Sequence, residues 1–111
     1  MIFIASVRGW NVPREILDEV VKIPGINVLY DKNYFYLDGS FKTEEQDKIG
    51  DCINFALDFV ESNHDIFRET VLAGGEIELY ITHLTRKTAG FVLDSMTVKR
   101  LASLGMSVGI D

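Results

Sequence analysis

The segment from Glu76 to Leu84, "EIELYITHL", alternates regularly between apolar and polar side chains. Successive residues of a β-strand point to opposite faces, so this pattern predicts a strand with one buried and one solvent-facing side. Strands of that kind form antiparallel sheets that are covered on one face only. The segment therefore restricts the fold to a sheet with helices on one face, with Ile77, Leu79 and Ile81 on the covered side.

The other segments predict the remaining elements in order. "IFIASV" predicts a first strand that "RGW" ends, and a helix capped by Asn11 follows. "INVLYDKNYFYLDG" predicts a hairpin. Thr43 and Gln46 form a capping box at the start of a long helix, and Asp65 caps a shorter one. After "EIELYITHL", the pattern predicts a strand at "AGFVLD", a helix capped by Ser95 and a last strand at "MSVGI".

The resulting order is βαββααββαβ. We expect a single α+β domain over residues 1–111, a mostly antiparallel sheet with helices packed on one face. The apolar fraction of 47% is ordinary for a globular domain and is sufficient for one hydrophobic core.

Charge is unevenly distributed along the chain. The net charge is −6, and residues 43–82 carry two Lys or Arg against ten Asp or Glu. An acidic middle disfavours nucleic-acid binding, which needs clustered cations, and is compatible with a basic protein partner.

The amino terminus predicts neither export nor a membrane anchor. Its apolar run ends at Val7 and no positive charge precedes it, so it is too short for a signal peptide or a membrane span. Cys52, the single cysteine, lies on the apolar stripe of the long helix and reads as a buried thiol. We expect a cytoplasmic protein.

No pattern indicates a metal, a cofactor or a catalytic nucleophile. The two histidines, His64 and His83, have no partners at metal-ligand spacing. We therefore expect no metal and no cofactor. Whether the chain is an enzyme stays open, with a non-enzymatic role favoured.

The long helix holds the most informative surface pattern. At 100° per residue, Phe55 falls in the middle of a face that carries Asp51, Asp58 and Glu61, with Phe59 at its border. A large apolar side chain ringed by charges is typical of an interface hot spot. Three explanations are open: the following helix covers Phe55, a second copy of the chain covers it, or a basic protein partner binds there.

The alternative site is an anion-binding one. Arg86 and Lys87 lie in the predicted turn "THLTRKTAG" next to His83, and Arg8 lies between the first strand and first helix. If the fold brought these four residues together, they would form an anion cradle. The simpler interpretation of the Arg–Lys pair is a solvated loop.

Tyr30, Tyr34 and Tyr36 crowd the predicted hairpin. Aromatic rings on a wet sheet face can stack on a base or a sugar. No basic patch surrounds them, so pairing across the hairpin is the simpler explanation.

From about Asp51 onward, the chain resembles a small bacterial domain family of uncharacterised function. The resemblance rests on "DCINFALDFV", "GEIELYITH", "GFVLDS" and "VKRLASLGMSVGID", about half of the chain. Such families include immunity-type proteins that block a toxin by binding it, often through an acidic surface. The resemblance implies protein binding and brings no catalytic residue with it.

The sequence thus favours a small cytoplasmic binding protein of immunity or regulatory type. Phe55, Phe59, Asp51, Asp58 and Glu61 would contact a basic partner, and a homodimer is possible. The alternative is a small-molecule or anion-binding domain, conceivably an enzyme.

Overall fold

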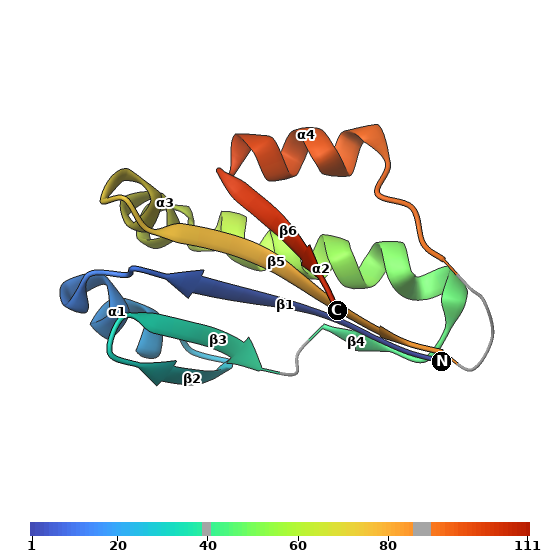
Figure 1. Ribbon diagram of the computed structural model, residues 1–111, viewed down its shortest axis with the longest axis horizontal. Coiled ribbons are helices and arrows are strands. Elements are labelled where there is room, and N and C mark those ends of the chain that lie inside the picture. Colours follow the sequence, from blue (N-terminus) through green and yellow to red (C-terminus); the bar gives the residue numbers. More distant parts are fainter. Residues whose placement is uncertain (39–40, 86–89) are drawn as a thin grey trace.

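The computed structural model describes residues 1–38, 41–85 and 90–111 (Figure 1). Its elements are β1 (Ile2–Trp10), α1 (Arg14–Val21), β2 (Asn27–Asp31), β3 (Tyr34–Asp38), β4 (Lys42–Thr43), the 3₁₀-helix η1 (Gln46–Lys48), α2 (Ile49–Ser62), α3 (His64–Leu72), β5 (Glu76–Leu84), α4 (Ser95–Ser103) and β6 (Met106–Ile110). In the described part of the chain, no helix is both long and apolar enough to cross a bilayer.

The strands form one sheet in the order β2-β3-β1-β5-β6, and the short β4 pairs with the beginning of β1. All pairs are antiparallel except β5 with β6. The longest pairing is β1 with β5, where Ile2 lies opposite Leu84 and Trp10 opposite Glu76. The other strands of the sheet pair on either side of this central pair.

One face of the sheet is buried under the helices. The strand residues on this face are Phe3, Ala5, Val7, Phe35, Leu37, Ile77, Leu79 and Ile81, all at most 1% exposed. Ring contacts of Phe35 with Phe67 and of Phe41 with Phe59 show that α3 and α2 pack on this face. In Figure 1 these helices lie behind the sheet, α1 covers the β2–β3 end, and α4 lies along β6.

The α+β class, the mostly antiparallel sheet and the helices on one face are therefore confirmed. The alternation in β5 is also confirmed, because Ile77, Leu79 and Ile81 are buried while Glu78 and Tyr80 are only half-buried.

Two strand predictions differ from the structure. "RGW" does not end β1, because Gly9 continues the strand and the Phe35 ring occupies the space where a side chain at position 9 would lie. The described residues of "AGFVLD", 90–94, form no strand; Ala89 lies outside the described residues. This segment is apolar because the Phe91 ring packs edge-on against Phe3 and His83.

The predicted helix caps were mostly misplaced. Asn11 has a left-handed backbone (φ 54°) and lies before Pro13, the residue that precedes α1. The Thr43 hydroxyl accepts a hydrogen bond from the Glu45 N–H (3.1 Å), and the Gln46 side chain donates to the Gly90 carbonyl (2.7 Å), so no capping box forms.

The starts of α3 and α4 differ as well. Asp65 lies in the first turn of α3 and does not cap it. Asp94, and not Ser95, caps α4 by accepting a hydrogen bond from the Thr97 N–H at 2.8 Å. In each case the local residue type indicated a helix start to within a few positions, as is usual for caps.

Candidate interaction surface

The outer side of α2 places Phe55 in solvent. Its side chain is 63% exposed, whereas the helix positions on the core stripe, including Cys52, Ala56 and Leu57, are at most 4% exposed. The first of the three explanations, that the following helix covers Phe55, is therefore wrong, because α3 packs its Phe67 ring against Phe59 of α2.

A hollow of about 370 Å³ adjoins Phe55. Phe41 and Cys52 contribute apolar atoms to it, and Lys42, Thr43, Lys48 and Asp51 surround them together with Phe55 itself. Because Phe41 is only 8% exposed, it belongs to the core as well as to the hollow. The arrangement offers an exposed ring beside a recess of side-chain size.

Phe59 does not belong to this surface. It is half-buried and its ring contacts Phe41 (6.0 Å) and Phe67 (6.2 Å). The helical wheel placed it at the border of the outer face, and the structure turns it toward the core, where it links α2 to α3.

Two of the predicted partner-binding carboxylates already have a partner within the chain. Arg100 of α4 donates to Asp58 and to Glu61, the latter at 2.5 Å, and also to the Asn54 side chain at 3.4 Å. The hydrogen bond from Arg100 holds the pKa of Glu61 below its ordinary value. The same contacts, with the Glu61 bond first, raise the pKa of Arg100.

The ion-paired cluster keeps a net negative charge, since one guanidinium faces two carboxylates. The Asp58 and Glu61 side chains remain 62% and 45% exposed, whereas Arg100 is 24% exposed. Asp51, on the hollow side of Phe55, makes no hydrogen bond or ion pair with any described residue. Thus Asp51 is the carboxylate beside Phe55 that a partner can reach without competing with Arg100.

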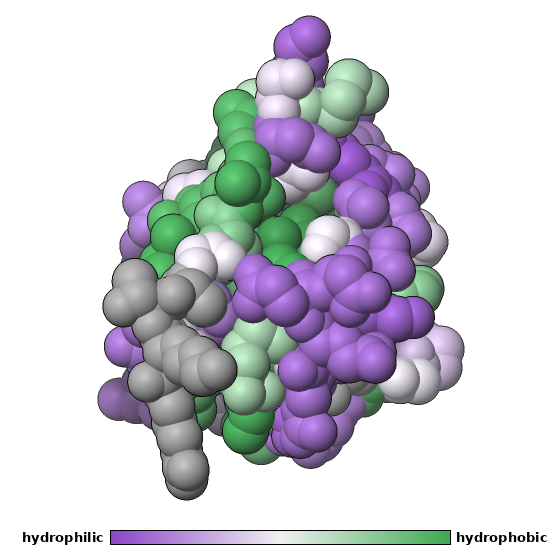
Figure 2. Space-filling model, turned by 90° about the vertical axis from the view of Figure 1, so that its right-hand side faces the viewer, coloured by the Kyte–Doolittle hydropathy of each residue, from purple (hydrophilic) through white to green (hydrophobic). Residues whose placement is uncertain are grey.

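At the end of the molecule where α2 begins, apolar surface lies beside hydrophilic surface (Figure 1). Figure 2 views the right-hand end of Figure 1 and shows a hydrophobic band, in green, beside a broad hydrophilic area, in purple. Val92 and Met96, before and in α4, are 83% and 72% exposed.

Of the four alternative anion-binding residues, the structure describes Arg8 and His83, and it holds these two apart. Arg8 lies opposite Glu78 and His83 lies opposite Phe3, so five strand positions separate them, and they point to opposite faces of the sheet. Arg86 and Lys87 lie outside the described residues.

Arg8 lies on the uncovered sheet face and already has an ion-pair partner there. Its Nε donates to Glu78 at 2.7 Å, and its guanidinium stacks over the rings of Trp10 (4.5 Å) and Tyr80 (3.8 Å). An anion at Arg8 would lie beside the Glu78 carboxylate, and this like charge disfavours the anion-binding alternative.

His83 is held among aromatic rings. It contacts Phe3 (5.8 Å between centroids) and Phe91 (5.5 Å), and its buried Nε2 has no hydrogen-bond partner among the described residues. Cys52 is buried, and this burial raises the pKa of its thiol. In the part of the chain that the structure describes, neither side chain has the neighbours that an activated nucleophile or base requires.

An aromatic cluster on the uncovered sheet face was not predicted from the sequence. Tyr34 and Tyr36 lie there as strand parity requires, but Trp10 and Tyr80 join them across the sheet. The Tyr36 hydroxyl is within 2.9 Å of the Ser6 hydroxyl. The alternation of side chains in β1 and β5 indicates that Trp10 and Tyr80 point to the uncovered face. Only the strand order shows that they meet Tyr34 and Tyr36 there.

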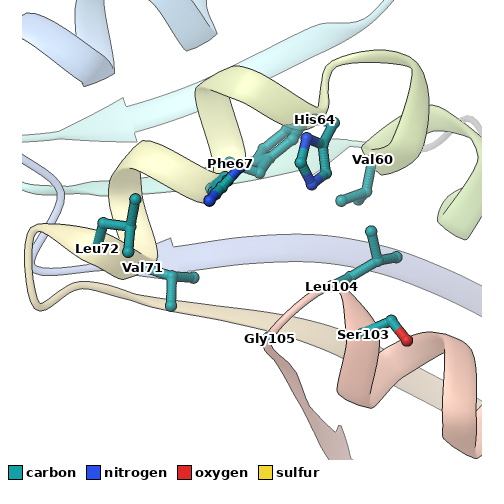
Figure 3. A pocket seen from close by; sticks show the side chains of 9 residues that line it. Val60, His64, Phe67, Val71, Leu72, Ser103, Leu104 and Gly105 are labelled. Carbon is teal, nitrogen blue, oxygen red and sulfur yellow. The ribbon is translucent and has the colours of Figure 1, made fainter.

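A second hollow, of about 320 Å³, lies between α3 and the turn from α4 to β6 (Figure 3). Val60 and His64 face Leu104 across it, and Val71 and Leu72 close one end. In the described residues, no group of three or more His, Cys, Asp or Glu could hold a metal ion there or elsewhere. The hollow can accept an apolar group, and none of the predicted site residues lines it.

Comparisons of the chain with protein-family models, with curated proteins and with solved structures found no match.

Proposed function

We propose that this chain is a non-enzymatic protein-binding module of immunity or regulatory type, and that its contact surface centres on Phe55 of α2. The partner would be a basic protein. It would present an apolar side chain to the hollow beside Phe55 and cationic side chains to the carboxylates around it.

The observation that carries this proposal is the 63% exposure of Phe55 next to a recess of about 370 Å³. Burying a Phe side chain contributes roughly 1.5–3 kcal/mol. An exposed ring beside a recess therefore offers a partner a favourable anchor, and such anchors dominate binding energies at interfaces.

The negative charge around Phe55 favours a partner that carries positive charge. Residues 41–62 hold six Asp or Glu, against which stand Lys42, Lys48 and the contacting Arg100. Exposed charges of one sign accelerate the association of an oppositely charged partner and orient it. Among the charged residues, Asp51 is the one through which we expect the strongest direct ion pair with the partner.

The proposal can be tested by affinity capture from the native lysate with Phe55→Ala. We expect it to lose a basic protein that the wild type retains, and to keep its free energy of unfolding within about 0.5 kcal/mol, as exposed sites usually do. The matched control is Leu72→Ala, which truncates another exposed apolar side chain on a neighbouring helix (73% exposed).

Asp51→Lys tests the charge separately. We expect slower association of the same protein with a weaker dependence on salt, measured by surface plasmon resonance with the purified partner. Asp51 is preferable to Asp58 here, because a change at Asp58 would also break its contact with Arg100. Equal capture by the wild type, Phe55→Ala and Leu72→Ala would contradict the proposal.

A further inference from the structure

No strand of the described chain pairs with the outer side of the edge strand β2. The sheet ends at β2, and its five residues pair with β3 in unbroken register from Asn27 opposite Asp38 to Asp31 opposite Tyr34. Among the described residues, no backbone hydrogen bond reaches β2 from elsewhere. Its outward N–H and C=O groups therefore form a template for another strand.

The usual protection of an edge strand is missing from β2. Proteins block exposed edges with lysine, proline, a bulge or a covering element. The strand reads "NVLYD" and has neither lysine nor proline. Its Leu29 and Tyr30 are 53% and 59% exposed, and they point to opposite faces. At the other edge of the sheet, β6 has α4 alongside it, while Figure 1 shows nothing beyond β2.

We propose that β2 pairs with β2 of a second copy of the chain, antiparallel and with the two-fold axis at Leu29. This register places Leu29 opposite Leu29, Val28 opposite Tyr30, and Asn27 opposite Asp31. A β-branched residue opposite an aromatic one is a favourable cross-strand pair. The Asn27 amide can donate to the Asp31 carboxylate, one oxygen of which already accepts the Lys32 N–H at 2.8 Å.

Neighbouring registers are less complementary. With the axis at Tyr30, each Asp31 carboxylate would face a leucine. With the axis at Val28, each Asn27 would face Leu29, and Ile26 would face Tyr30. The axis at Leu29 pairs polar with polar and apolar with apolar, which a symmetric interface requires of its own surface.

The dimer would extend the uncovered sheet face across both copies. Leu29 lies next to Tyr36 in the register of β2 with β3, so the two leucines would lie between two Tyr36 rings. The surface around Phe55 stays free, because α2 packs over β1 and β4, and neither of these strands pairs with β2. This inference therefore does not depend on the proposed function.

We expect the association to be weak, since a five-residue strand pair falls in the class of small, transient interfaces below about 1,200 Å². Sedimentation velocity of the purified chain from about 10 µM to about 1 mM should show a reversible monomer–dimer equilibrium with a Kd in that range.

Two substitutions test the register in opposite directions. Leu29→Lys places two ammonium groups face to face at the axis, and we expect at least a tenfold weaker dimer. Asn27→Lys places each ammonium opposite Asp31 of the other copy, and we expect a tighter dimer whose gain disappears at high salt. Both positions are exposed in the monomer, and circular dichroism should show the wild-type fold.

Leu72→Lys is the control, because it adds the same charge at an exposed leucine away from β2. It should leave the Kd unchanged. A chain that stays monomeric as the wild type and as Asn27→Lys would overturn the proposal. So would a dimer that survives Leu29→Lys.

Discussion

At the scale of single residues, His83 lies in an environment that its chemistry does not favour. Phe3 and Phe91 flank its ring, and the buried Nε2 has no hydrogen-bond partner in the described structure. A buried polar atom left unpaired costs roughly 1–3 kcal/mol. The side chain therefore fills space at the end of the sheet at the expense of stability.

His83→Phe should therefore stabilise the protein. The ring contacts with Phe3 and Phe91 persist and the unpaired nitrogen disappears, so we expect the free energy of unfolding to rise by about 1 kcal/mol. Urea denaturation at pH 7 measures this. His64→Phe is the control, because the imidazole there is about half exposed, and it should change stability by less than about 0.5 kcal/mol. A loss of stability in His83→Phe would show that Nε2 makes a bond beyond the described residues.

Phe55 and Phe59 show how far a helical wheel can be trusted. They are four residues apart and therefore lie about 40° apart around the helix axis. Phe55 is exposed, whereas Phe59 contacts Phe41 and Phe67. The wheel identified the outward ring correctly and could not decide the border residue, because that depends on which neighbouring elements supply rings.

At the scale of elements, α4 depends on contacts at two points. Asp94 caps its first turn, and this hydrogen bond lowers the pKa of Asp94. Arg100, one turn before its end, joins it to α2 through Asp58 and Glu61. Only Leu101 of this helix is buried, so polar contacts hold α4 to a greater extent than they hold α2.

Arg100→Ala should loosen α4 and leave two carboxylates without a cation. Since Asp58 and Glu61 are largely exposed, we expect a loss of no more than about 1 kcal/mol at pH 7, smaller in 1 M salt. The folded-state pKa of Glu61 is lowered, so the stabilisation is complete above the ordinary Glu pKa and is lost as the pH falls through the lowered value.

Urea midpoints of the wild type and Arg100→Ala should therefore differ at pH 7 and converge as the pH falls through the lowered pKa of Glu61. Arg14→Ala, which removes an exposed ion pair with Asp18 within α1, is the control and should have little effect. A difference that is independent of pH and of salt would show that Arg100 acts through the packing of its aliphatic part.

Sequence periodicity predicted most of the elements, but not the contacts between them. The alternation of β5 and the apolar stripe of α2 predicted buried faces that the structure confirms. The segment 90–94 was misread as a strand because Phe91 and Leu93 are apolar for a different reason: they pack against the core without pairing.

The contact of Arg100 with Asp58 and Glu61 joins residues 42 and 39 positions apart. No local pattern marks a contact of that range. The sequence alone therefore suggested more free carboxylates around Phe55 than the structure has. It also left Arg8 available, whereas Glu78 and two rings already contact it.

At the scale of the whole molecule, the two proposed surfaces belong to different parts of the sheet. The surface around Phe55 lies on α2, which packs over β1 and β4, and the pairing edge is β2. A dimer through β2 would thus carry two copies of the Phe55 surface. If both proposals hold, each dimer binds two partner molecules, and its attachment to a dense array of partners exceeds that of the monomer through multivalency.

Leu29→Lys should separate the two functions. On a surface with sparsely immobilised partner, it should bind with the same Kd as the wild type, since Phe55 and Asp51 are intact. On a densely coated surface it should dissociate faster, by about tenfold or more, because the second attachment is lost. Phe55→Ala should lose binding at both densities and keep the monomer–dimer equilibrium. If Leu29→Lys also weakened binding at low density, β2 would belong to the partner surface itself, and the division of the molecule into two independent surfaces would be wrong.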